Sequence, residues 1–117
     1  MASTVLIVDD HPVFRANARA VLESEGFDVV GEAGSAAEAL AALRRERPDV
    51  VLLDVQLPDG DGFELAEVLT SNGSTVNVVL VSSRDYSDFA HLIERSGARG
   101  FVPKAELSGS RLAALVA

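Results

Sequence analysis

The chain has 117 residues, of which 48% are hydrophobic, enough for a single domain around one hydrophobic core. It contains no cysteine, which excludes disulfides, thiolate nucleophiles and zinc–thiolate sites and favours a reducing, cytoplasmic compartment. The formal net charge of −8 argues against direct binding to nucleic acid through its phosphates. No apolar stretch is long enough to cross a membrane.

Strand patterns and helix patterns alternate five times along the chain. The expected strands, in order, are the apolar or β-branched runs Thr4–Val8, Phe27–Ala33, Val50–Asp54, Val76–Val81 and Gly100–Pro103. The helices that follow them are expected to begin near Pro12, Ala36, Phe63, Phe89 and either Ser108 or Ser110. Asp10 is a suitable N-cap for the first helix, which runs to about Glu25, and Ser35 has the capping-box spacing for the second.

The run Val50-Val51-Leu52-Leu53 leads directly into Asp54. Four apolar residues in a row are typical of a strand buried on both faces of a parallel sheet. Five strand–helix units predict one α/β domain over residues 1–117, a doubly wound parallel sheet with helices on both faces. Residues 55–62, with two glycines and a proline, are expected to form a loop, and residues 71–74 a turn.

Polar residues follow four of the expected strands. Asp9 and Asp10 follow the first strand, Asp54 ends the third, Ser82 follows the fourth and Lys104 follows the fifth. Parallel strands bring their carboxyl ends to one edge of a sheet, so these side chains meet there if the first and third strands are neighbours. Three adjacent carboxylates need a cation, and oxygen ligands favour Mg²⁺. A lysine and a hydroxyl beside them would complete a phosphoryl site in which an Asp carboxylate is the nucleophile.

Each of these residues also has a structural interpretation. Asp9, Asp10 or Asp54 could cap a helix or turn, Ser82 could be an ordinary strand-end hydroxyl, and Lys104 could be solvated. Their joint occurrence on four strand ends favours the functional interpretation. No site role is predicted for three further polar residues, namely the helix-start residue His11, the strand-end residue Glu32 and the helical residue His91.

The sequence closely resembles the receiver domain of two-component response regulators over nearly its whole length. The segments that carry the resemblance are VLIVDDHP, DVVLLDVQLPD, VLVSS and GARGFVPK, which begin at Val5, Asp49, Val79 and Gly97. The Asp-Asp-His-Pro start is similar to that of the subgroup whose full-length members carry a helix-turn-helix DNA-binding domain. The resemblance implies a flavodoxin-like fold with the strand order 2-1-3-4-5.

The resemblance also implies a phosphoacceptor and a metal site. Asp54 would accept a phosphoryl group from a phosphohistidine on a sensor histidine kinase. Asp10, Asp54 and the main-chain carbonyl of Gln56 would bind Mg²⁺ directly. Asp9 would act through a coordinated water.

The remaining candidate residues would bind the phosphoryl group or respond to it. Ser82 and Lys104 would contact its oxygens, and Phe101 would be the switch aromatic that turns inward when Ser82 is drawn to the phosphoryl group. Gln56 and Arg84 are similar in position to the family's variable pair that tunes the phosphorylated lifetime. Our hypothesis is that Arg84 alters the access of water to the acyl phosphate.

The sequence departs from the family pattern at three places. Pro103 precedes Lys104 and Ala105 follows it, whereas the family often has proline directly after the lysine, so the loop after the fifth strand is expected to differ. Ser82 stands where threonine is common. Phe101 lacks the hydroxyl of a switch tyrosine.

Two alternative functions are considered. A Mg²⁺-dependent phosphatase of the haloacid-dehalogenase type also uses an Asp nucleophile, but it places it in an Asp-x-Asp pattern after the first strand and encloses its substrate with a cap domain. A receiver-like module could also act by binding alone, without phosphorylation. The chain is therefore expected not to be a turnover enzyme.

The expected partners are a sensor histidine kinase and either an output domain or a downstream protein. A second copy of the chain is a further candidate partner. The last helix ends weakly in Ala-Ala-Leu-Val-Ala, which favours a stand-alone receiver over one cut from a longer regulator.

Overall fold

The computed structural model describes residues 3–71 and 74–116. Five strands form one parallel sheet, namely β1 (Thr4–Val8), β2 (Asp28–Ala33), β3 (Val50–Asp54), β6 (Asn77–Ser82) and β7 (Gly100–Pro103). Their order is β2-β1-β3-β6-β7. When only the strands of this sheet are counted, this is the order 2-1-3-4-5, so the expected flavodoxin-like doubly wound fold is confirmed.

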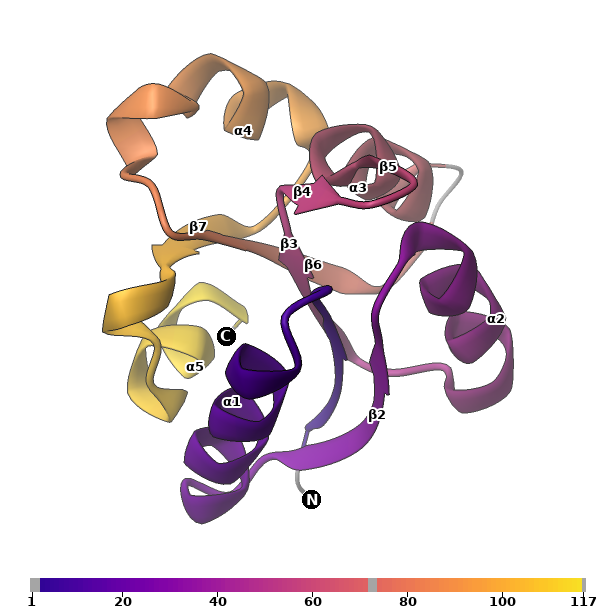
Figure 1. Ribbon diagram of the computed structural model, residues 1–117, viewed down its shortest axis with the longest axis vertical. Helices are drawn as coiled ribbons and strands as arrows, with labels where there is room; N and C mark the ends of the chain where they lie inside the picture. Colours follow the sequence, from indigo (N-terminus) through magenta and orange to yellow (C-terminus); the bar gives the residue numbers. More distant parts are fainter. Residues whose placement is uncertain (1–2, 72–73, 117) are drawn as a thin grey trace.

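Helices cover both faces of the sheet (Figure 1). Helices α1 (Pro12–Ser24) and α5 (Gly109–Val116) pack on one face, and α2 (Ala36–Glu46), α3 (Gly62–Thr70) and α4 (Ala90–Ser96) pack on the other. All five residues of β3 are buried, because helices lie over both of its faces and strands flank both of its edges. Its side chains alternate between the two cores, with Val51 and Leu53 in one and Val50 and Leu52 in the other.

The first helix begins at Pro12 as predicted, but its cap differs from the prediction. Its N-cap is His11 rather than Asp10, and no side chain in the described part of the chain caps it. The reason is a tight turn in which the main-chain N–H of His11 donates to Asp9 Oδ1 over 2.8 Å. This turn leaves Asp10 outside the helix, with its side chain partly exposed.

Other element ends follow the sequence more closely. At the start of α2, the Ser35 hydroxyl accepts a hydrogen bond from the main-chain N–H of Glu38. At the start of α5, the hydroxyl of Ser108, rather than that of Ser110, accepts one from the main-chain N–H of Arg111. The 3₁₀ turns η1 (Tyr86–Asp88) and η2 (Lys104–Glu106) precede α4 and follow β7. The expected turn at residues 71–74 has its closing hydrogen bond, while residues 72 and 73 lie outside the described part.

The expected loop after Asp54 contains a small antiparallel hairpin of β4 (Gln56–Leu57) and β5 (Gly60–Asp61). Asp59 in its turn accepts hydrogen bonds from the main-chain N–H groups of Ala36 and Ala37 over 2.7 and 3.0 Å. These two bonds hold the pKa of Asp59 below its ordinary value. The hairpin is thereby fixed to the N-terminal end of α2.

Gly62 lets the start of α3 approach the end of β3. A Cβ atom at this position would lie 2.1 Å from the main-chain oxygen of Asp54 and 2.7 Å from Cα of Val55. The Gly62 N–H donates to the Val55 carbonyl over 2.9 Å. Only glycine fits here without moving the backbone that carries Asp54.

Candidate functional site

The side chains predicted to converge do so at the carboxyl edge of the sheet. Asp9 and Asp10 follow β1, which is the neighbour of β3, so they lie beside Asp54 at the topological switch point. Ser82 ends β6, on the other side of β3, and Lys104 follows β7. Asp9 and Asp54 are buried, with exposed fractions of 0% and 5%.

Lys104 is the counter-charge of the two buried carboxylates. Its Nζ lies 2.6 Å from Asp9 Oδ2 and 3.4 Å from Asp54 Oδ2. It also lies 4.6 Å from the centroid of the Phe14 ring, which limits the directions that the ammonium group can take. The positive charge of one lysine therefore compensates two carboxylates.

The charge of Asp54 is only partly compensated. Burial, and after it the charge of Asp9, raise the pKa of Asp54 above its ordinary value, while Lys104 and the Gln56 N–H act in the opposite direction. That N–H lies 3.4 Å from Asp54 Oδ1. A buried carboxylate in this condition is stabilised by an added cation and is more basic than an exposed one.

His11 belongs to the same cluster, although the sequence predicted no site role for it. Its Nδ1 lies 2.8 Å from Asp9 Oδ1, 3.1 Å from Asp10 Oδ1 and 4.0 Å from Asp54 Oδ2. Carboxylate oxygens only accept hydrogen bonds, so the contact with Asp9 requires the tautomer with the hydrogen on Nδ1; Nζ of Lys104 lies 3.5 Å from the same nitrogen. The adjacency of His11 to two predicted ligands was the only sequence signal for this position.

The cluster fits a small, hard divalent cation. Asp9, Asp10 and Asp54 each offer a carboxylate oxygen, and these oxygens and a ring nitrogen of His11 lie within 4.8 Å of one another. Asp9 Oδ2 is buried and accepts no hydrogen bond from the described residues, because the nearby Lys104 ammonium does not have hydrogen-bond geometry toward it. An unsatisfied buried carboxylate oxygen among like charges is the situation that Mg²⁺ relieves.

Glu32 at the end of β2 acts on the cluster indirectly. It accepts a hydrogen bond from Nε of Arg15 over 3.1 Å, and Nη1 of the same arginine donates to the main-chain oxygen of Asp9 over 2.6 Å. Arg19 also binds Glu32, over 2.7 Å. These contacts fix the turn that carries Asp9, and no spacing rule in the sequence indicated them.

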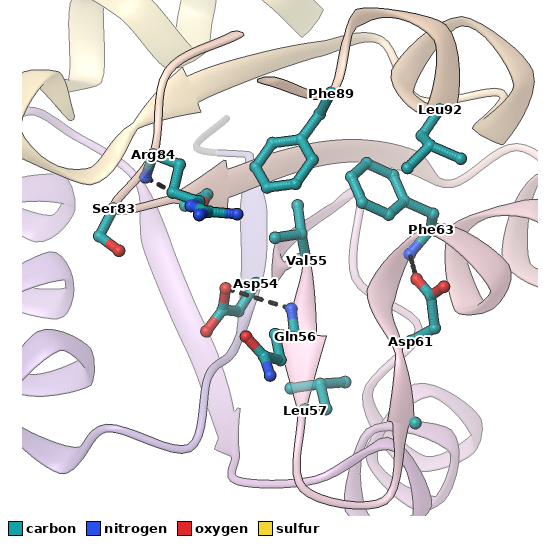
Figure 2. Close-up of a pocket in the computed structure, with 12 residues that line it drawn as sticks. Asp54, Val55, Gln56, Leu57, Asp61, Phe63, Ser83, Arg84, Phe89 and Leu92 are labelled. Carbon is teal, nitrogen blue, oxygen red and sulfur yellow. Dashed lines mark hydrogen bonds between the residues drawn. The ribbon is translucent and has the colours of Figure 1, made fainter. Parts of the chain in front are cut away.

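A cavity of about 660 Å³ opens beside Asp54 (Figure 2). Gln56 and Arg84 line it, as do the rings of Phe63 and Phe89, which face each other with centroids 5.3 Å apart. Both members of the expected lifetime-tuning pair therefore border the space next to the carboxylate. The main-chain N–H of Arg84 donates to the hydroxyl of Ser82 over 3.1 Å.

Phe101 is buried in this structure, with an exposed fraction of 9%. Its ring lies 6.2 Å from the ring of Tyr86 and 6.2 Å from that of Phe89, measured between centroids. The ring of Phe101, the expected switch residue, thus already lies inward, packed between two other aromatic rings. Phe89 connects this group to the cavity beside Asp54.

None of the helices in the described part of the chain is long and apolar enough to cross a membrane.

The model of the response regulator receiver domain family matches residues 5–117. BvgA of Bordetella pertussis, named as a transcription regulator of virulence factors, is 41% identical over 106 residues, which are 91% of this chain and 51% of BvgA. The DNA-binding transcriptional activator DevR/DosR of Mycobacterium tuberculosis is 41% identical over 115 residues, 96% of this chain and 52% of the activator.

Among solved structures, the signal receiver domain of the response regulator NarL from Mycobacterium tuberculosis superposes with a TM-score of 0.89. It is 31% identical, and the match covers 98% of this chain and 96% of that domain. The chain spans about half the length of the curated relatives named above. The family match, the identities and the shared fold together establish that this chain belongs to the receiver domain family of two-component response regulators.

Proposed function

We propose that this chain is the phosphoacceptor switch of a two-component system and that Asp54 receives the phosphoryl group. The observation that carries the proposal is the buried carboxylate of Asp54, which lies at the end of the central strand with Asp9 and Lys104 beside it. A carboxylate whose pKa is raised by burial is a better nucleophile than an exposed one. Family membership supports the same role.

In the proposed reaction an oxygen of Asp54 attacks the phosphorus atom of a phosphohistidine on a sensor histidine kinase. The new P–O bond forms as the P–N bond breaks, and the electron pair of that bond stays on the imidazole of the kinase. Lys104 moves from the carboxylates to the phosphoryl oxygens, and the hydroxyl of Ser82 donates to another of these oxygens. A later attack by water would release phosphate and restore the Asp54 carboxylate.

Mg²⁺ is the proposed cofactor. Asp10, Asp54 and the main-chain carbonyl of Gln56 would hold it, and Asp9 would contribute through a coordinated water. The unsatisfied Asp9 Oδ2 and the 4.8 Å cluster support this assignment. When bound, the ion neutralises part of the negative charge on the transferring phosphoryl group.

Phosphorylation is proposed to act on the face formed by β6 and β7. Ser82 would leave its hydrogen bond with the Arg84 N–H and turn toward the phosphoryl group. Phe101 is already buried, so phosphorylation would stabilise the inward arrangement rather than create it. The coupled change would reach Tyr86, whose ring packs on Phe101. Tyr86 is exposed at the surface, where a partner could contact it.

Arg84 is proposed to tune the lifetime of the phosphorylated form by controlling the access of water, because it lines the cavity that opens beside Asp54. Arg84→Ala should change the dephosphorylation rate measured by loss of the phosphoryl adduct over time. Arg99→Ala, on a part of the chain that does not line this cavity, is the control. An unchanged lifetime in Arg84→Ala would show that this side chain does not control water access.

The proposed partners are a sensor histidine kinase and an output domain or separate downstream protein in the cytoplasm, with a second copy of the chain as a further candidate. The transcription regulators that the chain matches are about twice its length, which supports an output function linked to gene expression. The chain would act as a switch that promotes its own phosphorylation and dephosphorylation, not as a turnover enzyme.

The test is intact-protein mass spectrometry after incubation with Mg²⁺ and acetyl phosphate. One phosphoryl adduct is expected on the wild-type chain and none on Asp54→Asn or in the presence of a chelator. Turnover of a small phosphomonoester would instead support the phosphatase alternative. A folded wild-type chain that takes no phosphoryl group from either acetyl phosphate or a kinase would support the phosphorylation-independent binding module.

A further inference from the structure

We propose that the imidazole of His11 competes with the divalent cation for the carboxylates of Asp9 and Asp10, and that it thereby lowers the affinity of the chain for Mg²⁺. This inference rests on the proposed function, because the ion is the one that would assist phosphoryl transfer to Asp54. It adds a residue that sets how much free Mg²⁺ the switch requires.

In the metal-free chain, His11 uses lone pairs of the Asp9 carboxylate. Asp9 Oδ1 accepts two hydrogen bonds from His11, one from the main-chain N–H over 2.8 Å and one from ring Nδ1 over 2.8 Å. A carboxylate oxygen has about two lone-pair sites, so this oxygen is saturated in the metal-free chain. Nδ1 also lies 3.1 Å from Asp10 Oδ1, so the same ring stands beside the oxygen of a second residue expected to bind the metal.

The ring of His11 also compensates part of the negative charge of the carboxylates. In the metal-free chain the three carboxylates repel one another, and the N–H of the His11 ring and the ammonium of Lys104 are the positive ends that face them. The ring therefore stabilises the metal-free state. A group that stabilises only the free state weakens binding by the same factor.

The ring of His11 can leave the carboxylates at little cost. The side chain of His11 is 64% exposed, so it can turn into solvent without opening the core. Its main-chain N–H remains bound to Asp9, and Pro12 starts the helix immediately after it. The turn that positions Asp9 is thus held by the backbone of His11 and does not depend on its ring.

The test is isothermal titration of the purified chain with Mg²⁺ alone, without a phosphodonor, for the wild type, His11→Ala and His11→Phe. Both variants lack the ring N–H donor but keep the main-chain N–H. We expect each to bind Mg²⁺ about tenfold more tightly, a size that fits the loss of one hydrogen bond to a charged group. His91→Ala is the matched control, because it removes an exposed imidazole from α4, away from the cluster.

Unfolding midpoints supply a second readout that separates competition from a general structural role. Competition predicts that His11→Ala lowers the midpoint without Mg²⁺ and increases the rise in midpoint on adding Mg²⁺. A residue with only a structural role would lower the midpoint without tightening binding, and that result would overturn the proposal.

The remaining outcomes are also decisive. Equal or weaker Mg²⁺ affinity in the His11 variants, with normal phosphorylation of the wild type, would refute the role of His11 and leave the phosphoacceptor function standing. A wild-type chain that binds no Mg²⁺ would refute both the competition and the proposed cofactor.

Discussion

Replacing Asp54 by Asn is expected to make the protein more stable at neutral pH. Burial, and then the charge of Asp9, raise the folded-state pKa of Asp54 above the ordinary carboxyl value of 3.8. A carboxyl whose pKa is higher in the folded state costs nothing below its unfolded-state pKa and costs stability as the pH rises through its folded-state pKa. The amide of Asn has no charge to bury, so Asp54→Asn avoids this loss.

The size of the effect follows from the surroundings of the carboxylate. Asp54 is 5% exposed, so solvent screens its charge little, while Lys104 Nζ at 3.4 Å offsets part of the cost. We expect a gain on the order of 1 to 2 kcal/mol in the free energy of unfolding, because the neutral amide removes a buried charge whose desolvation is only partly compensated. In a domain of this size such a gain raises the thermal midpoint by about 4 to 8 °C.

Urea unfolding without Mg²⁺, at about pH 7 and about pH 3, measures this directly. The gain should be present at the higher pH and nearly absent at the lower one. Asp28→Asn, at an exposed position of β2, is the control and should change stability by less than about 0.5 kcal/mol. A less stable Asp54→Asn at neutral pH, or an equal gain at both pH values, would refute the electrostatic reasoning.

Two further variants test the surroundings of Asp54 by urea unfolding. Gly62→Ala should cost about 1 to 3 kcal/mol and slow phosphorylation, because its Cβ would lie 2.1 Å from the Asp54 main-chain oxygen, whereas Gly60→Ala meets nothing closer than 4.0 Å and should be nearly neutral. Glu32→Gln should cost about 0.5 to 1 kcal/mol at neutral pH, because the hydrogen bonds and charges of its arginine partners hold its pKa below the ordinary value. That cost should disappear as the pH falls through the folded-state pKa, and it should exceed the cost of Glu23→Gln, since Glu23 pairs with Arg19 alone among the described residues, over 3.4 Å. An equal loss of stability in Gly62→Ala and Gly60→Ala, or in Glu32→Gln and Glu23→Gln, would contradict the contacts described.

The parts of the fold predicted best are those with a long-range periodic signal. The apolar run ending in Asp54 could be assigned to a central strand because a strand buried on both faces needs such a run. The strand order followed from the family resemblance, and once β1 and β3 are neighbours the meeting of Asp9 and Asp54 is a geometric consequence.

The parts that were missed depend on contacts that no local pattern encodes. The two-residue strands β4 and β5 are too short to show a period, so their hairpin was predicted as a loop. Asp10 is a good N-cap by residue type. The side chain of Asp9, however, accepts a hydrogen bond from the main-chain N–H of His11, and in the resulting turn His11 is the N-cap. The link from Glu32 through Arg15 to Asp9 joins three elements by long side chains, and it can be seen only once they are assembled.

The most direct test of the phosphoacceptor role is to locate the phosphoryl group on the chain. The phosphorylated protein would be reduced with borohydride, which converts an aspartyl phosphate to homoserine, and digested for peptide mass spectrometry. The account predicts that the modification lies on Asp54 alone, with none at Asp9 or Asp10. A modification at another carboxylate, or a phosphoryl group that resists borohydride as one on His11 would, would contradict it.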